Sequence, residues 1–222
     1  MLPYPSNPTG TTLPGETLEE IAALMKGRPI WIVSDEIYSE LVYRGRHRSI
    51  AEWLPEQTIV INGLSKSHSM TGWRIGFVFA PSFVIEQMVK VHQYSVSCTS
   101  SISQKAAIEA LTAGKHDAEA MRAAYAERLE YAYNRLTAMG LPVEKPDGAF
   151  YLFPSIAAFG MPSFDFALDV VEKAGVALVP GSAFSEYGEG HVRLSYAYSL
   201  DVLKEGLDRL ERYIDKKAAS AR

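Results

Sequence analysis

The spacing of apolar residues changes several times in the first eighty positions, and each change predicts a different element. Between Thr17 and Lys26 apolar residues stand three or four positions apart, which predicts an amphipathic helix. The continuous apolar runs Ile30–Val33, Thr58–Ile61 and Ile75–Ala80 predict strands. Because these runs show no polar alternation, we expect the three strands to be buried on both faces of a sheet.

Helical patterns alternate with these strands and set the expected fold class. The segments Val84–Tyr94 and Ile102–Ala113 repeat the helical spacing, and strands that alternate with helices form a mostly parallel sheet. Too few residues separate Asn62 from Arg74 for a crossover connection, so the strand that begins at Ile75 is expected to return antiparallel. The first part of the chain is therefore predicted as α/β, with a mostly parallel sheet and one antiparallel strand.

A long helical pattern from about His116 to Met139, closed by Gly140, separates this region from a second one. Shorter elements follow: strands at Gly148–Phe153, Val176–Val179 and His191–Ser195, and helices at about Phe164–Ala174 and Asp201–Lys216. This order is typical of a smaller α+β domain. We predict two domains, residues 1–113 and residues 114–222, and expect the terminal segment 216–222 to fray.

Composition excludes several classes of function. The 222 residues carry 22 Lys plus Arg against 26 Asp plus Glu, a formal charge of −4, so no broad basic field is available for nucleic acid or anionic lipid. A single cysteine, Cys98, forms neither an intrachain disulfide nor a thiolate zinc site, and no metal site is expected. The N-terminal segment lacks the features of a signal peptide, and no apolar run is long enough for a membrane helix. We expect a cytoplasmic protein that binds neither nucleic acid nor membrane.

Three residues with complementary chemistry fall at one edge of the predicted sheet. Asp35 follows the first strand and Lys66 follows the second, and the carboxyl ends of parallel strands form the edge where α/β folds bind ligands. Arg74 begins the antiparallel strand at the same edge. An acid, an amine and a guanidinium suit a ligand with a protonatable ring, a carbonyl and a phosphate, such as pyridoxal phosphate. Each residue also has an ordinary interpretation, because a strand-terminal Asp often caps a following helix, here residues 36–40, and an isolated Lys or Arg is often solvated.

Four segments occur together in an order and at a spacing that point to a family. They are NPTG (Asn7–Gly10), SDEIY (Ser34–Tyr38), LSKSHSMTGWRIG (Leu64–Gly76) and HVRLSYA (His191–Ala197). Together they make the chain resemble the fold-type I, class I and II aminotransferases, nearest to the aromatic and N-acetyl-diaminopimelate enzymes. The resemblance implies the C-terminal part of a pyridoxal-phosphate-binding large domain plus a smaller α+β domain. It also implies transfer of an amino group between an amino acid and a 2-oxo acid, in a homodimer.

The resemblance assigns roles to four residues around the cofactor ring. Lys66 matches the lysine that forms the aldimine with pyridoxal phosphate and later moves a proton. Asp35 matches the carboxylate that keeps the ring nitrogen protonated, so that the ring accepts electrons. Tyr38 and Asn7 match the groups that hydrogen-bond the ring oxygen. Taken alone, Asn7 would indicate only a turn before a proline.

The resemblance matches phosphate and substrate contacts less completely. Arg74 matches a phosphate ligand, and Arg193 matches the arginine that binds the substrate α-carboxylate as a bidentate pair. Taken alone, Arg193 would indicate an exposed charge on an edge strand. Many relatives place a phosphate-binding serine three residues before the lysine, where this chain has Gly63. Ser65 is the expected substitute.

The predicted sheet has few strands before Ile30, and the family carries a long N-terminal part before NPTG that includes a glycine-rich phosphate-binding turn. We therefore expect this chain to be a C-terminal portion and, by itself, a weak catalyst or none. Two alternatives stay open: a carbon–sulfur lyase on the same scaffold, and a truncated non-catalytic module that binds a partner through an open sheet edge. The hydroxyl-rich segment Ser95–Ser103 is expected either near a dimer interface or as a helix-capping loop.

Overall fold

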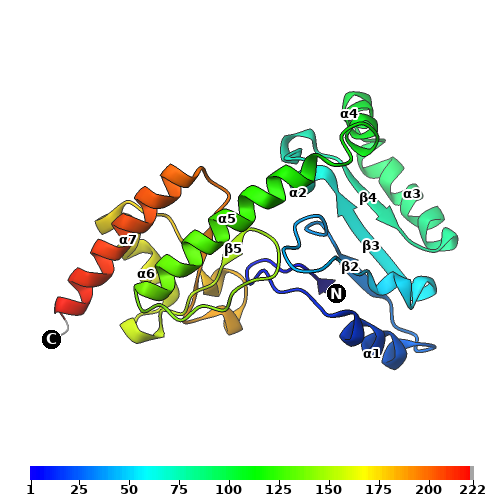
Figure 1. The fold of residues 1–222 in the computed structure, drawn as a ribbon. Helices are drawn as coiled ribbons and strands as arrows, with labels where there is room; N and C mark the ends of the chain where they lie inside the picture. The colour runs from blue at the N-terminus through cyan, green and yellow to red at the C-terminus, as the bar shows by residue number, and fades with distance from the viewer. Residues whose placement is uncertain (221–222) are drawn as a thin grey trace. The chain divides into compact units, whose positions relative to one another are not determined.

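The computed structural model describes residues 1–220, which form two compact units (Figure 1). The first unit comprises Met1–Asn7, Thr11–Arg122 and Asp147–Ala149, and the second comprises Pro8–Gly10, Ala123–Pro146 and the chain from Phe150 onward. Helix α5 (Asp117–Ala138) begins in the first unit and continues into the second. The domain boundary that we predict between residues 113 and 114 stays a prediction. Among the described residues, no helix has both the length and the hydropathy needed to cross a membrane.

The first unit contains a four-stranded sheet in the order β1-β2-β3-β4. Its strands are β1 (Leu2–Pro3), β2 (Ile32–Asp35), β3 (Thr58–Gly63) and β4 (Gly76–Phe79). Strands β1, β2 and β3 run parallel and β4 returns antiparallel to β3, which confirms the predicted α/β sheet with one antiparallel strand. Asp35 lies beside Ile61, and Gly63 lies beside Gly76. The carboxyl ends of β2 and β3 and the start of β4 therefore share one edge.

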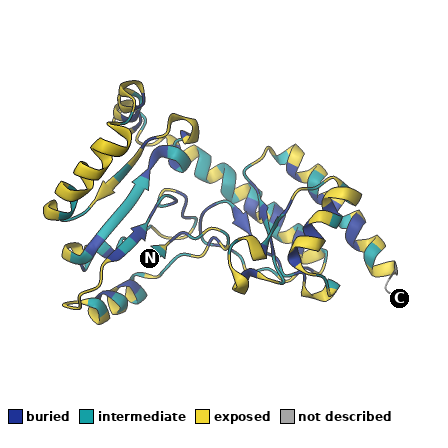
Figure 2. Cartoon of the chain, turned by 180° about the vertical axis from the view of Figure 1, so that it is seen from behind, coloured by how far each residue is buried: buried dark blue, intermediate teal, exposed yellow. Residues whose placement is uncertain are grey.

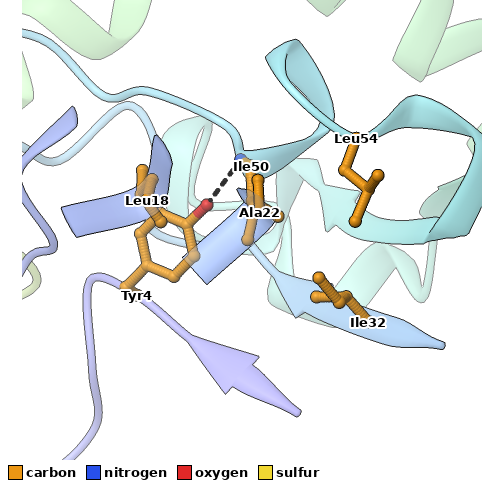
Figure 3. Packing of buried hydrophobic residues seen from close by; sticks show 6 residues of the cluster. All are labelled: Tyr4, Leu18, Ala22, Ile32, Ile50 and Leu54. Carbon is orange, nitrogen blue, oxygen red and sulfur yellow. Dashed lines mark hydrogen bonds between the residues drawn. The ribbon is translucent and has the colours of Figure 1, made fainter. Parts of the chain in front are cut away.

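Two apolar clusters pack most of the helices of the first unit. The helices are α1 (Gly15–Met25), α2 (Leu64–Ser67), α3 (Ser82–Val96) and α4 (Ser101–Leu111), with 3-10 turns η1 (Ile50–Glu52), η2 (Pro55–Gln57) and η3 (Thr71–Trp73). One cluster joins α1, β2 and η1, and Figure 3 shows its members Tyr4, Leu18, Ala22, Ile32, Ile50 and Leu54. The other joins α2 to α4 through Leu64, Met70, Ile75, Ala107 and Ala110. This second cluster supports the segment that carries Lys66.

The side chains of β4 are less buried than we expected. We expected Ile75–Ala80 to be buried on both faces, but Val78 is 38% and Phe79 is 61% exposed. Helix α3, which follows β4, has no buried residue, and Figure 2 shows it mostly in the exposed colour. The expectation is wrong for this strand and only partly met in β2 and β3, where Val33 and Ile59–Ile61 are half-buried. Strand β4 is also the last strand of the sheet, so one long side has no neighbouring strand among residues 1–220. The strand predicted from Ile30 begins at Ile32, and Ile30 itself is exposed.

The second unit is α+β, as predicted. Its antiparallel sheet has the order β5-β7-β6, with β5 (Tyr151–Leu152), β6 (Val179–Pro180) and β7 (Val192–Ser195). The other elements are α6 (Ser163–Ala174), α7 (Leu200–Ser220) and the 3-10 turns η4 (Ala157–Phe159), η5 (Gly181–Ala183) and η6 (Glu186–Gly188). Helix α6 packs against α7 and β6. Helix α7 continues through residues 216–220, where we expected fraying, and residues 221 and 222 lie outside the described part of the chain.

Candidate active site

Lys66 lies in α2, a single helical turn that follows directly on β3. Leu64 and Ser67 of the same turn are buried, whereas Lys66 is half-buried. The Lys66 Nζ lies 5.8 Å from the centroid of the Tyr38 ring. The structure thus brings together two predicted site residues from separate segments, one after β3 and one after β2.

Asp35 ends β2, and the backbone on both sides of it is held by neighbouring strands. The Tyr4 N–H donates to the Asp35 carbonyl oxygen at 3.1 Å. The Glu36 N–H donates to the Ile61 carbonyl oxygen at 2.8 Å, which extends the β2–β3 pairing by one bond. The position of the Asp35 Cα is therefore set by the sheet rather than by a loop.

The chain turns directly after Asp35 and does not form the helix that an N-cap would begin. Residues 37–40 form a turn, and the Ile37 N–H donates to Asp35 Oδ1 at 3.3 Å, as in an Asx turn. The helix-capping interpretation of Asp35 is therefore wrong. Tyr38 lies in this turn and is 6% exposed, while the Asp35 side chain is half-buried at the sheet edge.

Arg74 precedes β4 in a left-handed backbone conformation with φ of 53°. For residues other than glycine this conformation costs about 1–3 kcal/mol, and such residues cluster at ligand sites. The Arg74 Nη1 donates to the Thr71 carbonyl oxygen at 2.8 Å, and the Thr71 hydroxyl donates to the Ser65 carbonyl oxygen at 2.9 Å. The exposed Arg74 is thereby connected through Thr71 to the turn that carries Ser65 and Lys66.

Asn7 is exposed and belongs to the first unit, in the segment that follows β1. Gly63, at the position where the family resemblance predicts a serine, is the last residue of β3. Ser65, its expected substitute, is half-buried in α2. These three residues therefore lie in the same unit as Asp35 and Lys66.

Arg193 belongs to the second unit and lies in β7, the central strand of its sheet. Its guanidinium carbon lies 4.4 Å from the ring centroid of Tyr151 and 5.0 Å from that of Phe184. Arg193 is half-buried and lines a cavity of about 430 Å³ together with Val179 and Tyr198. The interpretation of Arg193 as a charge on an edge strand is therefore wrong. Stacking on aromatic rings restricts the orientation of a guanidinium, which suits bidentate binding of a carboxylate.

Sequence patterns did not predict a buried polar cluster at the end of β2. Glu36 is 3% exposed; its Oε1 accepts hydrogen bonds from the Ser34 and Ser49 hydroxyls at 2.8 and 2.6 Å, and its Oε2 lies 2.8 Å from His47 Nε2. Burial alone would raise the pKa of Glu36, but the hydrogen bonds from these three partners outweigh burial and hold the pKa below its ordinary value. Tyr4 stacks on His47, and burial raises the pKa of Tyr4 to about 12.

Comparison with known proteins identifies the family. The family model for aminotransferase class I and II matches residues 1–210. The chain belongs to this family. It is 66% identical over 217 residues to a probable N-acetyl-LL-diaminopimelate aminotransferase of Bacillus subtilis, a match that covers 98% of this chain and 55% of the relative. It is 44% identical to an aspartate aminotransferase of Pyrococcus abyssi, with 96% of this chain and 56% of the relative covered.

Solved structures agree with the fold described above. An aromatic aminotransferase from Pyrococcus horikoshii superimposes with a TM-score of 0.94 at 43% identity, covering 98% of this chain and 60% of that one. An aspartate aminotransferase from Thermus thermophilus gives a TM-score of 0.91 at 40% identity, covering 95% and 55%. These matches confirm the family resemblance and the predicted fold class. The chain spans a little over half the length of these relatives.

Proposed function

We propose that this chain carries the cofactor site and the substrate arginine of a pyridoxal-phosphate-dependent aminotransferase, which moves an amino group between an amino acid and a 2-oxo acid. The observation that supports this most directly is the approach of the Lys66 amine to the Tyr38 ring, at the edge where Asp35 ends β2. Membership of the aminotransferase family supports the same chemistry.

The donor set of the first unit fits pyridoxal phosphate. Asp35 offers an anion to a protonated ring nitrogen, and Tyr38 and Asn7 offer polar groups to the ring oxygen. Arg74 and Ser65 offer a guanidinium and a hydroxyl to the phosphate. When bound, the cofactor supplies an electron sink for breaking the Cα–H bond of an amino acid.

Lys66 and Arg193 are proposed to act on the substrate. The Lys66 amine would hold the cofactor and would move the Cα proton of the substrate as a general base. Arg193 binds the substrate α-carboxylate through two parallel hydrogen bonds. The rings of Tyr151 and Phe184, 4.4 and 5.0 Å from its guanidinium carbon, hold that group in a restricted orientation.

We further propose a cytoplasmic homodimer with domains at residues 1–113 and 114–222. The segment Ser95–Ser103, which joins α3 to α4, is proposed to lie near the dimer interface. Part of this segment already has a structural role, because the Ser103 hydroxyl donates to the Trp73 carbonyl oxygen at 2.7 Å. A monomer at micromolar concentration in gel filtration, for a chain extended to the length of its relatives, would contradict the homodimer.

Exposed apolar residues support one alternative, a non-catalytic module. Phe79 of β4 and Phe83 and Val91 of α3 are each at least 60% exposed, and apolar surfaces of this kind are typical of protein interfaces. The alternative of a carbon–sulfur lyase has no comparable support, because the relatives described above all carry aminotransferase names.

The proposal is tested by trapping the cofactor on the chain. The chain is mixed with pyridoxal phosphate, its absorption spectrum is recorded, the complex is reduced with borohydride, and the labelled peptide is identified by mass spectrometry. We expect a new visible band and label on Lys66, both lost in Lys66→Ala. The matched control is Lys90→Ala, because Lys90 is an exposed lysine of α3 that bonds only to a neighbouring glutamine side chain among the contacts described.

Each other outcome contradicts part of the proposal. Label on Lys90 or Lys105 in place of Lys66 contradicts the site assignment. The absence of a visible band favours the non-catalytic module. Release of sulfide from a cysteine-derived substrate, without amino transfer to a 2-oxo acid, favours the lyase.

A further inference from the structure

Glu36 is buried although it carries a carboxylate, and none of the roles proposed above uses it. Its partners are a hydroxyl of β2, on Ser34, and two groups at the far end of the following loop, on His47 and Ser49. An unpaired buried anion is strongly destabilising, so these partners are needed for the carboxylate to stay where it is. The Glu36 carboxylate therefore ties the end of β2 to the end of the loop.

The alternation of side chains along β2 connects this anchor to Asp35. Successive side chains of a strand point to opposite faces of the sheet. Ser34 and Glu36 are buried, and Asp35 between them is only half-buried. Since Glu36 is held on the buried side, Asp35 is directed to the opposite side.

The same anchor closes the loop that carries Tyr38. The chain leaves β2 at Glu36 and returns to it at His47 and Ser49, and residues 37–48 contain no named helix or strand. Both loop ends are fixed independently. Ser49 caps η1 by accepting a hydrogen bond from the Ala51 N–H at 3.2 Å, and the His47 ring stacks on Tyr4 at a centroid distance of 5.2 Å.

We infer that Glu36 is a positioning residue: held by Ser34, His47 and Ser49, it directs the Asp35 carboxylate and closes the loop that presents Tyr38. The inference rests on the proposed function for what Asp35 and Tyr38 bind. Glu36 acts only through these two residues, since its own carboxylate is enclosed by its three partners.

Two variants and one control test the inference. Glu36→Gln removes the charge and keeps the shape of the side chain. Ser49→Ala removes two hydrogen bonds, one donated to the Glu36 carboxylate and one accepted from the Ala51 N–H, and leaves the charges of the region unchanged. The control is Glu52→Gln, because Glu52 forms a salt bridge at 2.6 Å with Arg48 and accepts a hydrogen bond from the Ser49 N–H at 3.2 Å, which a glutamine side chain can also accept.

The first measurement needs no cofactor. The Ile37 N–H donates to Asp35 Oδ1, so its chemical shift in nuclear magnetic resonance spectra reports whether this hydrogen bond is kept. We expect Glu36→Gln and Ser49→Ala to move this chemical shift toward the value of an N–H without the hydrogen bond, and Glu52→Gln to leave it unchanged. Loss of stability without reorientation of Asp35 would not change the shift in the folded state, so the measurement separates positioning from a merely structural role.

The second measurement is the affinity for pyridoxine 5′-phosphate, which cannot bond covalently to Lys66. At metal sites, removing a residue that hydrogen-bonds a ligating side chain typically weakens metal binding about 10–100-fold. By analogy, we expect Glu36→Gln to bind pyridoxine 5′-phosphate about 10-fold more weakly than the parent chain. Unchanged Ile37 shifts in both test variants overturn the inference, as does an equal loss in Glu52→Gln. Altered Ile37 shifts in a chain that does not bind pyridoxine 5′-phosphate support the positioning of Asp35 and contradict the proposed function instead.

Discussion

Gly63 occupies the position where the family resemblance predicts a phosphate-binding serine, and the close packing of β3 on β4 gives a physical reason for the glycine. Its backbone is extended, with φ of 172°, a conformation that any residue adopts. A Cβ atom at Gly63 would lie 3.1 Å from the Gly76 Cα, 3.1 Å from the Ile75 carbonyl oxygen and 3.3 Å from the Ile37 Cδ1. Two of these three atoms belong to the backbone at the start of β4. A side chain at Gly63 therefore displaces the neighbouring strand.

The change Gly63→Ala involves two opposing effects on the free energy of unfolding. Replacing glycine by alanine at a compatible position stabilises by about 0.4–1 kcal/mol, because the unfolded chain loses freedom. Overpacking a well-filled site costs about 1–3 kcal/mol. Because the contacts at Gly63 are tight and mostly to backbone, we expect overpacking to prevail, with a net destabilisation of about 1–2 kcal/mol.

Gly72→Ala provides the matched control in the same segment. A Cβ at Gly72 meets no atom within 4 Å, and its φ lies outside the left-handed region. We expect this variant to be stabilised by about 0.4–1 kcal/mol, since only the unfolded-state effect remains. Urea denaturation of the two variants and the parent chain, followed by circular dichroism, measures both changes.

The refuting result is a Gly63→Ala chain at least as stable as the parent, with Gly72→Ala stabilised as expected. The strand would then accommodate a side chain, and steric packing would not explain the glycine. Gly63→Ser extends the test to function. We expect it to be destabilised at least as much as Gly63→Ala and to bind pyridoxine 5′-phosphate no more tightly than the parent, so a clear gain in affinity would contradict the packing argument.

Four further outcomes follow from the site. The three kinetic ones are measured in a chain extended to the length of its relatives, because this chain spans little more than half of them and is expected to be a weak catalyst or none by itself. Lys66→Ala should lower the rate of transamination by about 10³-fold, and a rate within tenfold of the parent would exclude Lys66 as the base. Asp35→Asn should retain cofactor binding while kcat falls by about 10²-fold, measured in steady state. Arg193→Lys should raise KM for the amino acid by about 10-fold through loss of one charge-assisted hydrogen bond, with kcat much less affected. The pKa of Glu36 is below its ordinary value of 4.5, so Glu36 contributes stability above about pH 4.5 that is lost as pH falls through its lower folded-state pKa. The difference in unfolding free energy between the parent and Glu36→Gln should therefore shrink in acid. A constant difference would contradict the pairing of Glu36 with His47.

The arrangement of Asp35, Lys66 and Arg74 was predictable from the order of strands. Each of the first two residues follows an apolar run closely, and parallel strands bring their carboxyl ends to one edge. The short connection before Arg74 excluded a crossover, which correctly predicted the antiparallel direction of β4. These inferences needed only strand positions and connection lengths, both of which are local properties of the sequence.

Contacts made by irregular segments were not predictable in this way. A loop without regularly spaced apolar residues carries Tyr38, His47 and Ser49. Its path determines how Lys66 approaches the Tyr38 ring and how Glu36 bonds to His47 and Ser49. Strand lengths were also overestimated where the backbone leaves the extended region. The strand predicted from Gly148 is limited to Tyr151–Leu152, and Ala149 has a left-handed φ of 59°. Hydropathy does not report such local geometry.

Asp35 and Glu36 are adjacent carboxylates in different surroundings, and the difference follows from the pleat of β2. Two anions side by side would repel each other, but alternation places their side chains on opposite faces of the sheet. On the buried face, His47 and two hydroxyls compensate the Glu36 charge. On the other face, the Asp35 carboxylate accepts a long hydrogen bond from the Ile37 N–H and stays half-buried. A strand that ends in two acids can therefore use one to fix its own position and leave the other for a cationic ligand, provided that the buried acid has a fixed partner such as His47.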